Sequence, residues 1–203
     1  MLKQSLITLA AAAALAAALP AQAQDTGIWL VRARAVHLDS ANKDDTGNGV
    51  TINNKWLPEV DFSYFFTPNF AAELILTVPQ KQTVYSNGVE IGSFKHLPPT
   101  LTAQYHFTSL GQFRPYLGAG VNYTRLSSVN FNSNVAALGL SLKNDSWGLA
   151  LQAGVDMPIG GGWILNADLK KVQIGTTIYS HGADLGKFKI DPLLFGLGVG
   201  KRF

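Results

Sequence analysis

The last stretch of the sequence, "LLFGLGVGKRF" (193–203), constrains the fold more than any other segment. Large apolar side chains occupy every second position from Leu193 to Val199 and return at Phe203, and glycines fill most of the positions between them. A period of two is typical of a β-strand, because successive side chains point to opposite faces. No residue follows Phe203 in the sequence, so we expect something other than a later segment to cover the apolar face of this strand.

The first 23 residues have the pattern of a secretory signal peptide. Lys3 supplies a short basic region, an alanine- and leucine-rich stretch follows, and Ala21-Gln22-Ala23 matches an A-x-A cleavage site. The apolar stretch is too short and too rich in alanine for a membrane anchor. We therefore expect residues 1–23 to be removed and residues 24–203 to form one exported domain.

The composition leaves two fold classes for that domain. Charged residues make up 14% of the chain and hydrophobic residues 47%, whereas an average soluble domain has about 25% charged residues. After residue 23 no apolar run approaches the length of a membrane helix, which is about 20 residues. The chain contains no cysteine, and its net charge of +3 comes without a run of Lys or Arg, which argues against disulfides and nucleic acid. A β-sandwich and a transmembrane β-barrel remain.

Eight segments of the chain show the same period-two alternation of side chains as the last stretch. The links between them alternate between long and short. Outer-membrane barrels have the same pattern, with long external loops and short periplasmic turns, and an even number of strands places both termini in the periplasm. The third long link, at 127–145, is compatible with a short helix or with extended strands, and both stay open. The eight segments are 27–39, 56–66, 70–79, 96–107, 113–126, 146–156, 163–175 and 188–203.

The less hydrophobic face of the segments favours the barrel over the sandwich. This face is rich in small residues, which fit a narrow closed interior better than a solvated surface. They are Gly118, Gly120, Gly148, Ala150, Gly154, Gly196, Gly198 and Gly200.

Aromatic residues gather near the two ends of the segments, as they do at the two interfaces of a membrane. The periplasmic group is Trp29, Tyr64, Phe66, Phe70, Tyr105, Phe107, Phe113, Trp163 and Phe203, and the external group is Trp56, Tyr123, Trp147 and Tyr179. We therefore predict an all-β fold, an eight-stranded antiparallel transmembrane up-and-down β-barrel. Lipid covers the apolar face of its last strand, and pairing of that strand with the first removes both sheet edges.

Four stretches of the chain resemble the outer-membrane protein W family. They are "HLPPTLTAQYHF", "RPYLGAGVNYT", "SWGLALQAGVD" and "IDPLLFGLGVGKRF", in this order along the mature chain. The resemblance implies an eight-stranded barrel in the outer membrane of a Gram-negative bacterium, with a narrow and largely apolar passage. Some members of the family are linked to uptake of hydrophobic compounds such as alkanes.

The resemblance also implies an insertion signal at the end of the chain, which the barrel insertion machinery would recognise. The sequence departs from the family pattern at Lys201, where an aromatic residue is usual. The signal consists of Phe203, Val199, Leu197 and Phe195.

Charged residues of both signs point into the predicted lumen at mid-depth and below. Unpaired charge in a narrow interior is expensive, so these groups should form ion pairs across it. We interpret them as a polar plug, because side chains fill the interior of an eight-stranded barrel; an ion or proton path is the alternative. The plug residues are Arg32, Arg34, Glu59, Asp61, Glu73, Asp156, Asp168 and Lys170.

The external half of the predicted lumen is apolar instead. An apolar funnel above a polar plug would accept a hydrophobic molecule and block its straight descent, so we hypothesise lateral release through the wall. Pro58, Pro79, Pro98, Pro99 and Pro192 lack ladder donors and could loosen that wall, or they could simply end the strands. The funnel residues are Val36, Leu38, Leu57, Ile75, Leu126, Val172, Ile190 and Leu194.

These patterns predict passive uptake of small hydrophobic molecules, and the alternative is a structural or surface-binding barrel of the adhesin or receptor type. We expect no enzyme, because the sequence has no G-x-S-x-G elbow and no catalytic cluster assembles at a rim. The four histidines lack metal-ligand spacing, so we expect no metal and no cofactor. Expected partners are outer-membrane lipid and lipopolysaccharide, the barrel insertion machinery and small hydrophobic ligands, with no nucleic acid.

Overall fold

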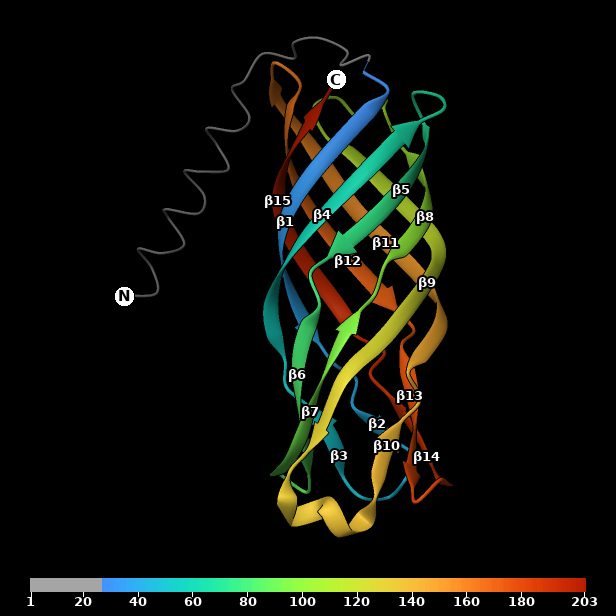
Figure 1. Ribbon diagram of the computed structural model, residues 1–203. Helices are drawn as coiled ribbons and strands as arrows, with labels where there is room; N and C mark the ends of the chain where they lie inside the picture. The colour runs from blue at the N-terminus through green and yellow to red at the C-terminus, as the bar shows by residue number, and fades with distance from the viewer. Residues whose placement is uncertain (1–26) are drawn as a thin grey trace, which may run out of the picture.

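The structure is a computed structural model that describes residues 27–203. Its main body is a closed barrel of eight antiparallel strands, in which β9 also pairs with β11 and so completes the ring (Figure 1). The predicted fold class is confirmed, whereas the predicted signal peptide at 1–23 lies outside the described residues. The barrel strands are β1 (Trp29–Asp39), β4 (Lys55–Phe65), β5 (Phe70–Thr77), β8 (Thr100–His106), β9 (Arg114–Phe131), β11 (Asp145–Gly160), β12 (Trp163–Val172) and β15 (Leu193–Arg202).

The first and last barrel strands pair along their whole length. The register of β1 and β15 runs from Leu30 opposite Arg202 to Asp39 opposite Leu193. At the end of this ladder the backbones of Trp29 and Phe203 exchange hydrogen bonds of 3.0 and 2.9 Å. This closure leaves the barrel without a sheet edge, as a bilayer requires.

The two ends of the barrel differ in the length of their connections. At one end β4–β5, β8–β9 and β11–β12 are joined by short turns, and Trp29 and Phe203 lie at this end (Figure 1). The turn between β11 and β12 contains Gly160, Gly161 and Gly162 with φ of 98°, 57° and 78°, a backbone conformation that side chains disfavour. Short turns mark the periplasmic end of an outer-membrane barrel.

At the other end the long links extend the wall rather than forming irregular loops. One sheet continues from the outer half of β9 as β7 (Val89–Leu97), β6 (Gln80–Ser86) and β3 (Val50–Ile52). A separate four-stranded sheet carries the rest of the extension, and η1 (Ser133–Leu138) is a 3-10 helix between β9 and this sheet. Its strands are β10 (Leu140–Leu142), β13 (Gly175–Ser180), β14 (Ala183–Lys189) and β2 (Lys43–Asp44).

The extension corrects two sequence-based boundaries and decides one question that the sequence left open. The segment 96–107 is broken by two prolines, since β7 ends at Leu97 and β8 begins at Thr100. The segment 188–203 divides between β14 and β15. In the third long link both open alternatives occur, because β9 runs on to Phe131 and η1 follows it.

Large apolar side chains cover the outside of the barrel wall, for example Leu149, Leu151 and Leu197. Aromatic residues lie at both ends of this surface, with Trp56 and Trp147 exposed toward the extension and Phe66 and Trp163 at the turn end. Tyr179, which we expected at the outer interface, instead lies in β13 of the extension. Among the described residues no helix is long and apolar enough to cross a membrane.

Candidate ligand pathway

Arg32 lies at the centre of a polar layer that crosses the barrel interior. Its side chain has no exposed surface. Nε donates to Oδ1 of Asp61 on β4 (2.9 Å), Nη2 donates to Oε1 of Glu73 on β5 (2.8 Å), and Nη1 donates to Oδ2 of Asp156 on β11 (3.1 Å). One guanidinium therefore joins carboxylates from both sides of the lumen.

Arg34 and Lys170 extend this layer one step toward the extension. Arg34 Nη1 donates to Glu59 Oε1 at 2.8 Å, and its Nη2 donates to Glu73 at 3.1 Å. Lys170 Nζ, from β12, lies 2.5 Å from Glu59 Oε1 and 3.1 Å from Asp168 Oδ1. These contacts bring together all eight residues that we predicted as the polar plug.

Neutral side chains complete the layer, and one of them escaped the sequence analysis. The hydroxyl of Tyr116 on β9 donates to Asp168 Oδ2 at 2.7 Å, and Gln152 Nε2 donates to the same oxygen at 2.8 Å. Tyr116 shares its face with Gly118 and Gly120, which was the available signal. A Cβ at Gly154 would lie 2.4 Å from the Tyr116 ring, so the small residue on β11 makes room for the large one on β9.

The polar layer crosses the barrel interior and is almost entirely buried. Arg32, Asp61 and Glu73 have no exposed surface, and every member of the predicted plug is buried. Opposite charges at hydrogen-bond distance offset the cost of this burial only while both partners are present. A molecule that enters from the extension therefore meets an ion-paired floor.

The predicted funnel is packed more tightly than we expected. Val36, Leu38 and Leu57 form one buried cluster against Leu194. A cavity of about 30 Å³ remains, which we call the rim cavity. That volume is close to the space one water molecule occupies in the liquid. The lining of the rim cavity includes Leu38, Leu57, Ile75, Val172, Leu194, Gln80 and His96, with Glu59 and Lys170 of the polar layer.

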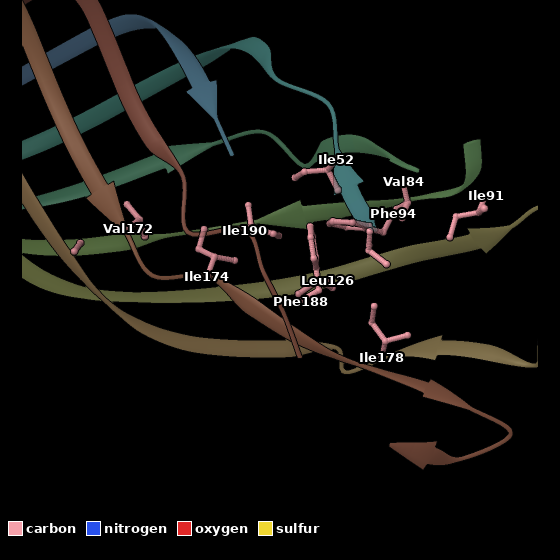
Figure 2. Close-up of a cluster of buried hydrophobic side chains, with 12 residues drawn as sticks. Ile52, Val84, Ile91, Phe94, Leu126, Val172, Ile174, Ile178, Phe188 and Ile190 are labelled. Carbon is pink, nitrogen blue, oxygen red and sulfur yellow. The ribbon is translucent and has the colours of Figure 1, made fainter. Parts of the chain in front are cut away.

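The other two predicted funnel residues lie farther out. Leu126 and Ile190 belong to a larger apolar cluster that fills the space between the two sheets of the extension (Figure 2). Figure 2 shows this cluster extending from Val172 and Ile174, next to the barrel, to Ile178 and Ile91. The expected open funnel is thus two apolar regions separated by packed side chains.

The outer region contains a cavity of about 320 Å³, which we call the outer cavity. Its lining comes from both sheets of the extension and from η1, and it is mostly aliphatic and aromatic. Sequence reasoning placed these residues, apart from Phe188, in loops, although Asn87-Gly88 between two alternating runs is a strong hairpin signal. The lining includes Val50, Val84, Ile91, Phe94, Phe131, Val135, Leu138, Leu140, Leu142, Ile178, Leu185 and Phe188.

The wall beside the rim cavity has a break in its backbone ladder. Pairing of β4 with β5 stops at Glu59 and Thr77, and pairing of β3 with β6 starts at Ile52 and Val84. Between these points side-chain groups join the two sides. Lys55 Nζ donates to the Lys81 carbonyl (3.0 Å), the Thr83 amide donates to Asn53 Oδ1 (2.7 Å), and the Thr77 hydroxyl donates to the Pro58 carbonyl (2.6 Å). Two of the predicted wall-loosening prolines lie in this interval, Pro58 and Pro79.

The rim cavity reaches this weak part of the wall. Leu76 lines the rim cavity, yet 37% of its surface is exposed on the outer face of the barrel. Pro98 also lines the cavity, and its carbonyl accepts a hydrogen bond from Asn122 Nδ2 at 3.2 Å. The lining of the rim cavity therefore includes a residue that is also exposed on the outer face of the barrel.

The residues of the predicted insertion signal lie on the outer face of β15 and at its end. Phe195, Leu197, Val199 and Phe203 are all exposed. Lys201 Nζ lies 5.1 Å from the centre of the Trp163 ring and donates to the carbonyl of Gly161. Lys201, which stands where an aromatic residue is usual in the family, thus contacts Trp163 and Gly161 at the turn end of the barrel.

A closed eight-stranded barrel with an apolar outer surface and an ion-paired interior defines a small integral outer-membrane protein. The chain belongs to the OmpW family, whose family model matches residues 25–203. It is 37% identical to outer membrane protein W of Vibrio cholerae over 218 residues, with complete coverage of both chains. It is an integral protein of the outer membrane, as are its relatives in this family.

Two further relatives extend the comparison. The dibenzothiophene metabolism operon protein PahQ of Pseudomonas aeruginosa is 31% identical over 150 residues, which are 70% of this chain and 69% of that protein. The crystal structure of OprG from Pseudomonas aeruginosa superposes with a TM-score of 0.74 at 27% identity. That alignment covers 87% of this chain and 96% of OprG.

Proposed function

We propose that this barrel facilitates passive uptake of small hydrophobic molecules, which enter the outer cavity and leave sideways into the membrane. The observation that carries this proposal is an apolar cavity of about 320 Å³ outside a barrel whose interior is closed by ion pairs. A water channel would need the opposite arrangement, with an open polar lumen.

The lining of the outer cavity supports capture of apolar solutes. Transfer of each CH₂ group from water to such a lining contributes about 0.8 kcal/mol. Aromatic and aliphatic side chains such as Phe94, Ile178 and Phe188 supply that surface. PahQ, whose name links it to dibenzothiophene metabolism, supports the same class of compound.

The break between β4 and β6 supports lateral release. The polar layer blocks descent, because a hydrophobic molecule would have to displace the ion pairs around Arg32 and Arg34. At the break, by contrast, few hydrogen bonds join the two sides of the wall. An apolar molecule that moves through it passes directly into hydrocarbon.

Whole-cell uptake tests the proposal as a whole. Cells with and without the protein receive a labelled medium-chain alkane or a small labelled sugar of similar mass. We expect faster entry of the alkane alone, and we expect Leu57→Asp and Ile75→Asp to abolish it while the protein still inserts. Faster entry of the sugar would make the protein a pore, and no change for either solute would favour a structural or surface-binding barrel.

A cysteine pair tests the exit route separately, because the chain has no cysteine of its own. Asn53→Cys combined with Thr83→Cys places two thiols across the break. Oxidation should lower alkane uptake, and a reductant should restore it. The matched control is Thr51→Cys with Tyr85→Cys, which staples two residues already paired in the β3–β6 ladder. Equal uptake by the oxidised and reduced forms of the first pair would place the exit elsewhere.

A further inference from the structure

Gln82 lies on β6 between the outer cavity and the rim cavity. Three alternate residues of β6 point to the interior, and Val84 lines the outer cavity whereas Gln80 lines the rim cavity. Gln82, between them, is fully buried. A molecule that moves from one cavity to the other must therefore pass the level of its side chain.

The neighbouring strand places a second polar group at the same level. Phe94 on β7 is directly opposite Gln82 in the ladder, and His96 is opposite Gln80. Phe94 lines the outer cavity and His96 the rim cavity. Gln82 and His96 are diagonal neighbours on one face of an antiparallel pair, a spacing that long side chains can bridge.

Both side chains are buried with polar atoms that have no hydrogen-bond partner among residues 27–203. These atoms are Nε2 and Oε1 of Gln82 and Nδ1 of His96, and the two residues are 0% and 1% exposed. The next inward amide on the strand differs, because Gln80 Nε2 donates to the Val78 carbonyl at 2.9 Å. An unpaired buried polar group costs about 1–3 kcal/mol.

The surroundings of Gln82 would suit an apolar side chain. Phe94, which is opposite Gln82, and Leu126, which is opposite His96, are both buried members of the apolar cluster drawn in Figure 2. An amide at this position therefore does not stabilise the fold. Binding to a ligand that passes from one cavity to the other would explain its presence. A neutral imidazole offers one hydrogen-bond donor and one acceptor.

We propose that Gln82 and His96 form a selectivity site that binds one neutral hydroxyl or carbonyl group on an otherwise apolar ligand. The inference rests on the proposed uptake function and narrows its substrate class to singly oxygenated hydrocarbons such as alcohols, phenols and ketones. The apolar cluster holds the hydrocarbon part, and the amide and imidazole supply the donor and acceptor.

The test measures binding of two molecules that differ by one hydroxyl group. Purified full-length protein in lipid nanodiscs is dialysed against radiolabelled naphthalene or radiolabelled 1-naphthol at pH 7, and empty nanodiscs correct for partition into lipid. We expect the wild type to bind 1-naphthol about tenfold more tightly than naphthalene, the difference that one satisfied polar contact provides. Gln82→Leu and His96→Phe should each reduce this preference, and the double variant should abolish it.

Two further variants guard the interpretation. Gln82→Met keeps nearly the same shape, so it gives the answer if Gln82→Leu fails to insert. Thr124→Val is the matched control, because Thr124 is fully buried on β9 but lines neither cavity, and its hydroxyl donates to Asn122 Oδ1 at 2.7 Å. We expect Thr124→Val to leave the preference unchanged.

The possible results separate this inference from the function on which it rests. If naphthalene and 1-naphthol bind equally well to the wild type, or if the Gln82 variants keep the preference, the selectivity site is wrong although capture of apolar ligands stands. If the wild type binds neither compound above the level of empty nanodiscs, both proposals fail. A loss of preference in Thr124→Val as large as in Gln82→Leu would also overturn the assignment to Gln82.

Discussion

The polar layer and the outer cavity are built on the same wall but have opposite interiors. In the polar layer the inward positions of the barrel strands carry charges that pair across the lumen, as Arg32 does with Asp61, Glu73 and Asp156. In the extension the inward positions carry Val84, Phe188 and similar residues, and space remains between them. Residue choice at alternate positions therefore decides whether a stretch of β-wall closes or admits a molecule.

The comparison also separates two sources of stability. The polar layer is stabilised by mutual charge compensation, so it tolerates the loss of a partner poorly. The extension is stabilised by apolar packing around a cavity. A substitution that removes part of this packing should therefore destabilise the extension and leave the barrel unaffected. Three predictions test this difference.

The largest effect should come from Arg32→Met. The substitution leaves Asp61, Glu73 and Asp156 buried without their shared guanidinium. We expect the free energy of unfolding to fall by about 3–5 kcal/mol, measured by urea titration of the protein in lipid vesicles with tryptophan fluorescence. Arg125→Met, at an exposed position of β9, is the control and should change it by less than about 0.5 kcal/mol. Equal effects would mean that the layer contributes no special stability.

A smaller and more local effect should follow Phe188→Ala. Phe188 is buried in the apolar cluster of the extension and lines the outer cavity. Loss of the ring should cost about 3 kcal/mol within the extension and leave the ion-paired barrel intact. Limited trypsin digestion should then cut β14 at Lys187 or Lys189, while the eight barrel strands stay resistant.

Leu185→Ala, on the same strand but 41% exposed, is the matched control and should leave β14 protected. Digestion of barrel strands in Phe188→Ala would show instead that the two regions unfold as one unit, and the contrast drawn above would be lost.

The smallest effect concerns the turn between β2 and β3, outside the membrane. Partial burial of Asp44 by itself would raise the pKa of its carboxyl. Hydrogen bonds from the amides of Val50, Thr46 and Asn48 outweigh this effect and hold that pKa below its ordinary value. A carboxyl whose pKa is lower in the folded state than in the unfolded state stabilises the fold at pH values above its unfolded pKa. That contribution is lost as the pH falls through the folded pKa.

Hydrogen exchange of the Val50 amide checks this expectation. Protection should decrease as the pH is lowered from neutral toward the acid range, after correction for the intrinsic exchange rate. Asp44→Asn should remove the pH dependence. A wild-type amide whose corrected protection does not change with pH would contradict the assigned role of the carboxylate.

The barrel could be predicted from the sequence because each of its strands shows its inward and outward faces directly. The glycines opposite Phe195, Leu197 and Val199 indicated a narrow interior, and the alternation of long and short links indicated the topology. The charged inward residues could be assigned to one layer because pairing is the only inexpensive arrangement for them. Their individual partners depend on strand register across the lumen, which one sequence does not contain.

The extension and the pathway were harder to predict. The strands of the extension are short and mix apolar with polar residues, as in "QKQTVYS" at 80–86, so their periodicity is weak. Which sheet each strand joins is decided by contacts between distant links, such as β2 with β14. Gln82 resembles any other polar residue in the sequence, and only its burial without partners distinguishes it.

The pairing of β1 with β15 has a consequence for the assembly of the protein. The partner of the first strand is the last barrel strand along the chain, so the ring cannot close before residues 193–202 have been made. Contacts between such distant parts of a chain form slowly, and until they form, both strands present unpaired edges that can aggregate. The order of the strands therefore makes closure of the ring a late step in folding. A chain that lacks even its final segment would be left with two open edges and no way to reside in a bilayer.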